Sequence, residues 1–421
     1  MTLINKIEDK IMPLALKVAS NRELTAVRNA MYNLMPFLII GSFFLLLAAL
    51  PIPGYGDFMA NVFGAGWDSF LTKITDATFG VMTVIVVLAT SYYYAESFEM
   101  DGLLAPLTSL AFFLVITPFV DGTIPMMWLG AQGMLIGILC GLGVTRFFIY
   151  LYNKNLFPQM PEGVPPGVMK SFNSLVPVTL ILMIAMIINI TMSFTNFDSI
   201  NDMIYLLLSQ PLLLVGNTLP GIVIAEGIAS ILWVFGIHGN DVVLSVMRPI
   251  WLLLSAENLA AVQAGLEPVN IITQQFKDAY LQIGGSGSTL PLLLVILLTS
   301  KSKHLRMIAA LSLLPGIFNI NEPVIFGLPI VLSPIFAIPF IIVPGVYATI
   351  SYFAMSSGLV ALTNGLVIPW TTPVFISGLL VSGPSGLVLQ IVLVVVGMAI
   401  YYPFVRMADK QIMKRQEAKE N

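Results

Sequence analysis

Long apolar stretches alternate with short polar segments along the first half of this 421-residue chain. A helix needs about 20 predominantly apolar residues to cross the hydrocarbon core of a bilayer. Runs near that length occur at about 31–50, 77–95, 103–119, 127–152 and 174–195. This pattern predicts an all-α polytopic membrane protein.

The second half of the chain has shorter apolar runs, interrupted by proline and glycine. Pro249 interrupts one of them, and six prolines follow between Pro315 and Pro344. Proline removes a backbone donor and clashes inside a helix, and irregular backbone at membrane depth must be covered by protein or line a cavity. We therefore expect discontinuous helices and two re-entrant hairpins, near 223–256 and 316–340. Residues 257–283 are expected to form an interfacial amphipathic helix.

The distribution of basic residues predicts the orientation, because Lys and Arg collect on the cytoplasmic side. They cluster near the amino terminus, in the loops at 154–170 and 301–306, and in the tail at 406–415. These clusters fit about ten spans with both termini cytoplasmic. We expect an amino-terminal domain over 1–205 and a second domain over 206–421. Residues 1–30 predict an amphipathic helix, lying either on the membrane surface or against the protein's own cytoplasmic face.

Composition excludes an ordinary soluble enzyme. Hydrophobic residues make up 57% of the chain and charged residues 10%, whereas soluble domains carry roughly 25% charged residues. The net charge of −3 and the distribution of the charged residues do not indicate a nucleic-acid-binding surface. The single cysteine, Cys140, lies in an apolar run, where it cannot form an internal disulfide and is expected to be inert. No cofactor or metal site is expected.

Glu322 is the only charged residue between Arg306 and Arg406. A buried, ionised carboxylate is costly unless partners surround it, so an isolated acid in an apolar region is a candidate functional residue. We expect its carboxylate to accept hydrogen bonds from sugar hydroxyls. The alternative is a protonated or capped carboxyl at the tip of a hairpin.

His238 lies in the run Gly-Ile-His-Gly-Asn-Asp at 236–241. The two glycines allow the backbone to approach a ligand closely, and Asn240 and Asp241 add polar groups within one turn. Two interrupted segments, one with His238 and one with Glu322, indicate a binding site near the bilayer midplane. The alternative for His238 is a buried histidine satisfied by backbone carbonyls.

Two further segments are candidates for substrate contact. Trp370 is flanked by prolines and threonines, so its indole is expected to be held in a turn, either under the apolar face of a pyranose or as an interfacial anchor. The run Gly-Gly-Ser-Gly-Ser-Thr at 284–289 lacks the lysine of a phosphate-binding loop. It predicts a flexible polar turn, with Gly285 and Ser286 as possible substrate contacts.

Three of these motifs together resemble a known family. The runs at 236–241 and 284–291, and Asn-Ile-Asn-Glu-Pro-Val-Ile-Phe-Gly at 319–327, are similar to the membrane component, EIIC, of bacterial phosphotransferase systems. The similarity is to the lactose, cellobiose and diacetylchitobiose branch and covers nearly the whole chain.

The resemblance implies a homodimer in the bacterial cytoplasmic membrane, with the amino-terminal half at the interface and the other half carrying the sugar. It implies that a phosphocysteine on a separate EIIB protein phosphorylates the sugar 6-hydroxyl, so this chain is the transporter subunit of a phosphotransferase. It also implies residue roles: Glu322 and His238 hold and activate the hydroxyl, Trp370 stacks on a sugar ring, and the remaining substrate contacts are Asn240, Asp241, Asn321, Gly285 and Ser286.

A proton-coupled sugar symporter is the chief alternative function. In that case Glu322 and His238 would load and unload a proton as the site changes face. A channel or a purely structural membrane protein has no use for an acid and an imidazole at interrupted helices.

Overall fold

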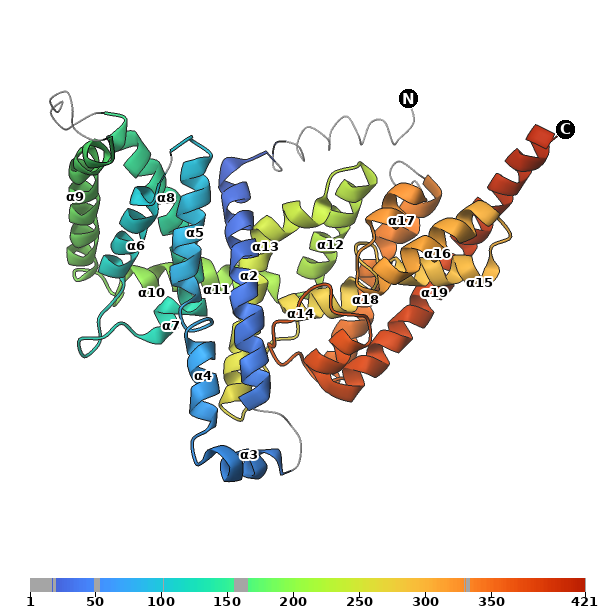
Figure 1. Ribbon diagram of the computed structural model, residues 1–421, viewed down its shortest axis with the longest axis horizontal. Coiled ribbons are helices and arrows are strands. Elements are labelled where there is room, and N and C mark those ends of the chain that lie inside the picture. Colours follow the sequence, from blue (N-terminus) through green and yellow to red (C-terminus); the bar gives the residue numbers. More distant parts are fainter. Residues whose placement is uncertain are drawn as a thin grey trace. The chain divides into compact units, whose positions relative to one another are not determined.

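The structure, a computed structural model, describes residues 17, 20–48, 54–100, 102–154, 166–328, 330 and 334–420. Within these residues the secondary structure is helical, without a strand, apart from one isolated bridge between Val120 and Thr123 (Figure 1). The predicted all-α class is confirmed. Most of the amino-terminal amphipathic segment predicted over 1–30 lies outside the described residues.

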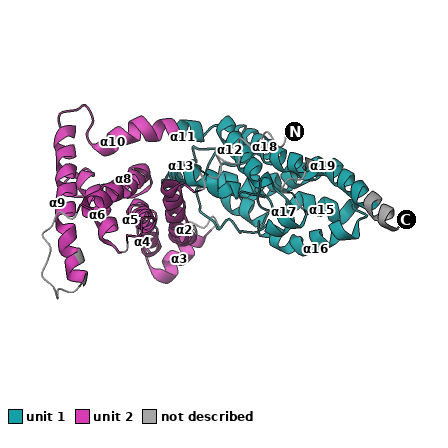
Figure 2. Ribbon diagram, turned by 90° about the horizontal axis from the view of Figure 1, so that it is seen from above, with its two compact units in different colours: residues 1–19, 213–421 teal, residues 20–212 magenta. Residues whose placement is uncertain are grey.

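The chain divides into two compact units (Figure 2). Residues 20–212 belong to one unit, here the amino-terminal unit, and residues 213–421 belong to the other, the carboxy-terminal unit. The roles expected for the two halves, dimerisation and sugar transport, remain predictions.

The helices of the amino-terminal unit coincide with the apolar runs of the sequence. Each of the five runs between 31 and 195 is occupied by one helix or by a short helical series. The elements are α2 (Arg22–Ala48), α3 (Tyr55–Phe63), α4 (Asp68–Asp76), α5 (Met82–Glu96), α6 (Leu104–Ile116), α7 (Met126–Leu129), η1 (Ala131–Gly133), α8 (Met134–Tyr152), α9 (Pro166–Met192), α10 (Ile200–Ile204) and the π-helix η2 (Tyr205–Ser209).

The core of this unit forms where α5 packs against α2, α6 and α8. Phe113 and Phe148 are fully buried there. Three buried hydroxyls from α5, α6 and α8 also meet: Ser91, Ser109 and Thr145 hydrogen-bond to one another. Mutual pairing satisfies polar groups that would otherwise be costly between apolar helices.

The carboxy-terminal unit contains the broken helices and the loops that the candidate site uses. Its elements are α11 (Gln210–Gly216, which begins just before the unit boundary), α12 (Leu219–Val234), α13 (Gly239–Gln263), α14 (Gln274–Phe276), the π-helix η3 (Lys277–Leu281), α15 (Leu290–Thr299), α16 (Lys303–Ile317), α17 (Glu322–Gly327), α18 (Pro334–Ser356) and α19 (Ile376–Glu420). α12 packs against both α13 and α18, and α15 packs against α16 and α19.

Three prolines do not interrupt helices as the sequence predicted. Pro249 lies inside the 25-residue α13, and Pro339 and Pro344 lie inside the 23-residue α18. The prediction that such prolines exclude regular long helices is wrong at these positions. A proline removes one backbone hydrogen bond, and packing against neighbouring helices, as between α18 and both α12 and α19, compensates for that loss.

Residues 257–283 do not form the predicted interfacial helix. α13 ends at Gln263, an irregular segment follows, and the chain resumes as α14 and η3. Ile272 to Lys277 are buried, and so are Ala279 to Ile283. The prediction is wrong because polar groups of this segment are buried against other protein groups: Gln274 Nε2 donates to Asp278, and Lys277 pairs with Glu226.

Five helices of the described chain are long and apolar enough to span a membrane, or six if the bent pair Ile200–Gly216 and Leu219–Val234 is one span. The five are Ala131–Tyr152, Gly167–Met192, Gly239–Gln263, Ile335–Ser356 and Ile376–Met413. The membrane character is thereby supported, whereas about ten spans, the re-entrant hairpins and the orientation of the termini remain predictions.

Asp409, a buried carboxylate on α19, joins that helix to the start of α16. It accepts hydrogen bonds from the Ser300 hydroxyl at 2.6 Å, the Lys301 N–H at 3.0 Å and the Ser302 N–H at 2.8 Å. An acid that accepts free N–H groups ahead of a helix stabilises its amino-terminal end.

Candidate functional site

Three motif-bearing segments of the carboxy-terminal unit meet at Ser286. The Asn240 side-chain amide donates to the Ser286 hydroxyl at 2.9 Å, and the Asn321 amide donates to the Ser286 carbonyl at 2.6 Å. Asn321 also donates to the Thr289 hydroxyl at 3.1 Å. The segments at 236–241, 284–291 and 319–327 are far apart in sequence but form one polar cluster.

The loop at 284–289 is buried and held by hydrogen bonds. The Gly284 N–H donates to Asn319 Oδ1 at 2.9 Å, and its carbonyl accepts from the Thr289 hydroxyl at 2.6 Å. The Tyr401 hydroxyl donates to the Gly287 carbonyl at 2.6 Å. The turn is therefore present, but the expectation that it is flexible is wrong, because side chains from other segments satisfy its backbone.

Gly285 allows this loop to approach Asn321 closely. Its φ is +90°, and a Cβ placed on it would lie 2.5 Å from Asn321 Cγ and 2.6 Å from the Asn319 carbonyl oxygen. Only a residue without a side chain fits both the backbone conformation and the space.

His238 lies at the amino-terminal end of α13, with 45% of its side chain exposed. Its Nδ1 atom is 3.3 Å from the Asp241 N–H nitrogen and 3.4 Å from Asp241 Oδ1. The Trp233 ring lies against the imidazole, with 4.3 Å between the ring centroids. The alternative of a buried structural histidine is wrong. Asp241 engages Nδ1, which leaves Nε2 for contact with a ligand.

Glu322 begins α17, and its side chain is exposed. Within the described part of the chain it has no recorded hydrogen bond or ion pair. The expected burial of this carboxylate is therefore wrong, whereas its role as an acceptor for sugar hydroxyls stays a prediction. The adjacent Asn321, not Glu322 itself, makes the protein contacts, and the carboxylate is left accessible.

Trp370 lies in a turn that Asn319 connects to the cluster. The Thr372 N–H donates to the Pro369 carbonyl at 2.8 Å, which closes the turn. Asn319 Nδ2 donates to the carbonyls of Trp370 at 2.8 Å and Thr372 at 3.1 Å. Trp370 is 46% exposed, so part of its surface is available to a ligand or to lipid.

The structure thus brings four of the predicted residues into direct contact: Asn240, Gly285, Ser286 and Asn321. Trp370 is connected to them through Asn319. His238 and Glu322 lie next to members of this cluster in the sequence, but no contact between the two side chains is recorded within the described residues. Asp241 contacts His238.

A buried ion pair, Glu226 and Lys277, lies close to this cluster and was not predicted as part of the site. The Glu226 side chain is 1% exposed, and Lys277 Nζ, 2% exposed, lies 3.6 Å from its Oε1 atom. Lys277 Nζ is also 3.7 Å from Asp278 Oδ1. Glu226 is the only charged residue of α12, so its isolation within an apolar run was a signal of the same kind as that of Glu322.

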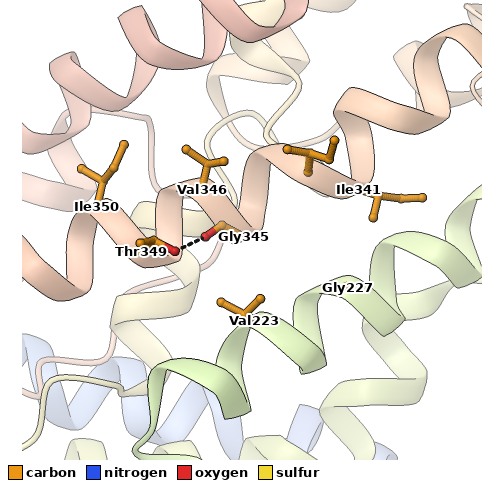
Figure 3. A pocket seen from close by; sticks show the side chains of 8 residues that line it. Val223, Gly227, Ile341, Gly345, Val346, Thr349 and Ile350 are labelled. Atoms are coloured by element: carbon orange, nitrogen blue, oxygen red, sulfur yellow. Dashed lines mark hydrogen bonds between the residues drawn. The ribbon is translucent and has the colours of Figure 1, made fainter.

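A groove between α12 and α18 is a separate feature, with a volume of about 460 Å³ (Figure 3). Its only polar side chain is Thr349, which donates to the Gly345 carbonyl on its own helix at 2.8 Å. A sugar site needs several convergent polar groups, so this groove does not fit one. No group of three or more His, Cys, Asp or Glu side chains that could hold a metal is found in the ranges that the structure describes.

Apolar helices of spanning length, and a polar cluster formed by one loop and the starts of α13 and α17, define a polytopic membrane protein with a site for a polar ligand. The family described as phosphotransferase system, EIIC, matches residues 28–344. The chain therefore belongs to the EIIC family of phosphotransferase-system permeases, and the symporter alternative receives no support.

Several relatives resemble the chain along most of its length. It is 40% identical to the lichenan permease IIC component of Bacillus subtilis (strain 168) and 40% identical to the cellobiose-specific EIIC component of Geobacillus stearothermophilus. Each of these alignments covers 99% of this chain and 96% of the relative. The crystal structure of the transporter ChbC, the IIC component of the N,N'-diacetylchitobiose-specific phosphotransferase system, superposes with a TM-score of 0.94. The two sequences are 42% identical, over 98% of this chain and 99% of ChbC.

Proposed function

We propose that this permease binds a β-linked disaccharide of the cellobiose or diacetylchitobiose type and moves it across the bacterial cytoplasmic membrane. It then presents the sugar 6-hydroxyl to phosphorylated EIIB. The main structural support is the junction at Ser286, where hydrogen bonds from Asn240 and Asn321 bring three polar segments together. The names of the cellobiose- and diacetylchitobiose-specific relatives support the sugar class.

Glu322 and His238 are proposed to hold and activate the hydroxyl. The exposed Glu322 carboxylate takes the proton of the 6-hydroxyl, and His238 Nε2 orients the oxygen. That oxygen attacks the phosphorus of the phosphocysteine, so a P–O bond forms as the P–S bond breaks, and the thiolate remains on EIIB. Phosphoryl transfer depends mainly on alignment and on charge stabilisation, and a positioned carboxylate serves as a general base.

The other site residues are proposed to bind the sugar. Asn240, Asp241 and Asn321 contact hydroxyls, together with Gly285 and Ser286 of the buried loop. Trp370 stacks on a pyranose ring, for which its exposed indole is suited.

The phosphoryl donor is proposed to be a separate EIIB protein at the cytoplasmic face. This chain has a single cysteine, and Cys140 is buried within α8. A lactose-specific EIICB component of Staphylococcus aureus (strain COL) is 29% identical, and the alignment covers 99% of this chain but 74% of that relative. Its name joins the two components in one protein, which supports a working partnership between them. We further propose a homodimer with both termini in the cytoplasm.

The test uses the purified full chain in proteoliposomes with radiolabelled cellobiose and diacetylchitobiose. With phosphorylated EIIB supplied at the cytoplasmic side, we expect uptake of label and recovery of sugar 6-phosphate. Glu322→Gln and His238→Gln should bind the sugar weakly or transfer phosphate slowly. Accumulation driven by a pH gradient without EIIB would refute the phosphotransferase mechanism and favour a symporter.

Matched controls are available for both substitutions. Glu267→Gln changes an exposed acid in the same unit, and His304→Gln changes the other histidine, which is also exposed. Both controls should retain uptake and phosphorylation. The site assignment would be wrong if the Glu322 and His238 variants behaved like these controls.

A further inference from the structure

Glu226 is connected by hydrogen bonds to a residue of the proposed sugar site. Its Oε2 atom accepts from Gln282 Nε2 at 2.8 Å, and Gln282 Oε1 accepts from Asn240 Nδ2 at 3.1 Å. Glu226 and Gln282 are both buried. One continuous chain of polar contacts therefore runs from the buried ion pair with Lys277 to the cluster at Ser286.

The carboxylate determines the orientation of each amide in this chain. A carboxylate only accepts hydrogen bonds, so Gln282 must direct its NH₂ group toward Glu226. Its carbonyl oxygen must then face Asn240, which responds by directing its own NH₂ group toward Gln282. Without a group at position 226 that can only accept, both amides could rotate by 180° and pair equally well.

The consequence appears at the Asn240 carbonyl oxygen. Asn240 Nδ2 donates to both Gln282 and Ser286, whereas Asn240 Oδ1 is covered and accepts no hydrogen bond from the described residues. An unsatisfied acceptor costs free energy that a donor group on a ligand can recover. A hydroxyl group of a sugar is such a donor.

We propose that Glu226 is a positioning residue for the sugar site, acting through Gln282 to hold Asn240 in the orientation that leaves its Oδ1 atom as the unpaired acceptor. A sugar hydroxyl donates to this atom when the bound sugar displaces the groups that cover it. This inference rests on the proposed function. Glu226 does not touch the sugar, and its effect is transmitted through the two amides. Lys277 supplies the counter-charge that accompanies the carboxylate in the interior.

The test is a double-mutant cycle on sugar affinity with the purified full chain. Glu226→Gln should weaken cellobiose or diacetylchitobiose binding about 3- to 10-fold, the worth of one neutral hydrogen bond. Asn240→Ala should weaken binding at least as much. The double variant should bind no more weakly than Asn240→Ala alone, because Glu226 acts only through Asn240.

Two further variants keep the test decisive if Glu226→Gln folds poorly. Gln282→Met breaks the amide chain but leaves the Glu226–Lys277 pair intact, and it should reproduce the loss. The exchange Glu226→Gln with Gln282→Glu places an acceptor-only group next to Asn240 again, and it should restore affinity to within about 2-fold.

The outcomes separate the two proposals. Wild-type sugar binding and EIIB-dependent phosphorylation test the proposed function, and if both are absent the inference fails with it. If the wild type binds sugar but Glu226→Gln and Gln282→Met bind equally well, the positioning role is refuted while the proposed function stands. The positioning role would also be refuted if the loss of affinity in Glu226→Gln added to that of Asn240→Ala in the double variant, or if the exchanged variant recovered no affinity. Either result would indicate a merely structural role for Glu226.

Discussion

Substitution of Gly285 by alanine should damage the centre of the candidate site, and its cost can be worked out from the geometry. At a φ of +90° an alanine carries a left-handed backbone penalty of about 1–2 kcal/mol. Its Cβ would lie 2.5 Å from Asn321 Cγ, an overlap that typically costs about 1–3 kcal/mol. The sum is about 2–5 kcal/mol. Displacement of Asn321 would also weaken its hydrogen bond to the Ser286 carbonyl.

Gly265→Ala is the matched control, since Gly265 has a φ of +71° but open space around its Cβ position. Gly265→Ala should therefore be destabilised only by the backbone penalty and not by steric overlap. We would measure, for both variants, the temperature at which half of the purified protein remains monodisperse, together with sugar affinity. Gly285→Ala should be less thermostable than Gly265→Ala and should alone bind sugar weakly. Equal thermostability and equal affinity of the two variants would refute the packing argument.

Two further substitutions test contacts outside the sugar-contacting groups, each by the same thermal assay. Tyr401→Phe removes the donor to the Gly287 carbonyl and should lower the free energy of unfolding by about 1–3 kcal/mol. Tyr402→Phe changes a neighbouring tyrosine that is 48% exposed and should be nearly neutral. Equal effects of the two substitutions would contradict a role for the hydrogen bond. Asp409→Asn replaces one of the two carboxylate oxygens that accept hydrogen bonds ahead of α16, and it should lower thermostability by a similar amount. Lys410→Gln, at an exposed position, should not. An Asp409 variant of unchanged thermostability would show that these hydrogen bonds are dispensable.

The helices of the amino-terminal unit could be predicted from the sequence because the apolar runs there are near the length of a membrane span and almost free of charged residues. The run at 31–50 corresponds to α2, and the run at 174–195 corresponds to α9. In such segments length alone identifies a helix, since each residue satisfies its backbone within the same segment. Asn240, Ser286 and Asn321 also stand out in the sequence as polar residues in apolar surroundings, and they do meet in the structure. Their role in sugar binding stays a prediction.

The carboxy-terminal unit was predicted less well because tertiary packing overrides local signals there. Proline at 249, 339 and 344 was expected to end helices, but the helices continue through these positions. Lys277 lies in the segment 257–283 that the sequence predicted as an interfacial amphipathic helix, but it is buried in the structure. Its partner Glu226 lies on a different helix, and no local pattern indicates such a pairing.

The two isolated acids of this unit show why isolation in the sequence does not by itself predict burial. Both Glu226 and Glu322 stand alone among apolar residues, and an unpartnered buried carboxylate is costly in either place. Folding supplies Glu226 with a lysine and an amide, so that carboxylate can be buried. A carboxylate that must bind a transient sugar cannot have its acceptors filled permanently by protein groups, and it must remain reachable. The exposure of Glu322 therefore agrees with the proposed role better than the burial expected from sequence, because in that role its partner arrives with the substrate.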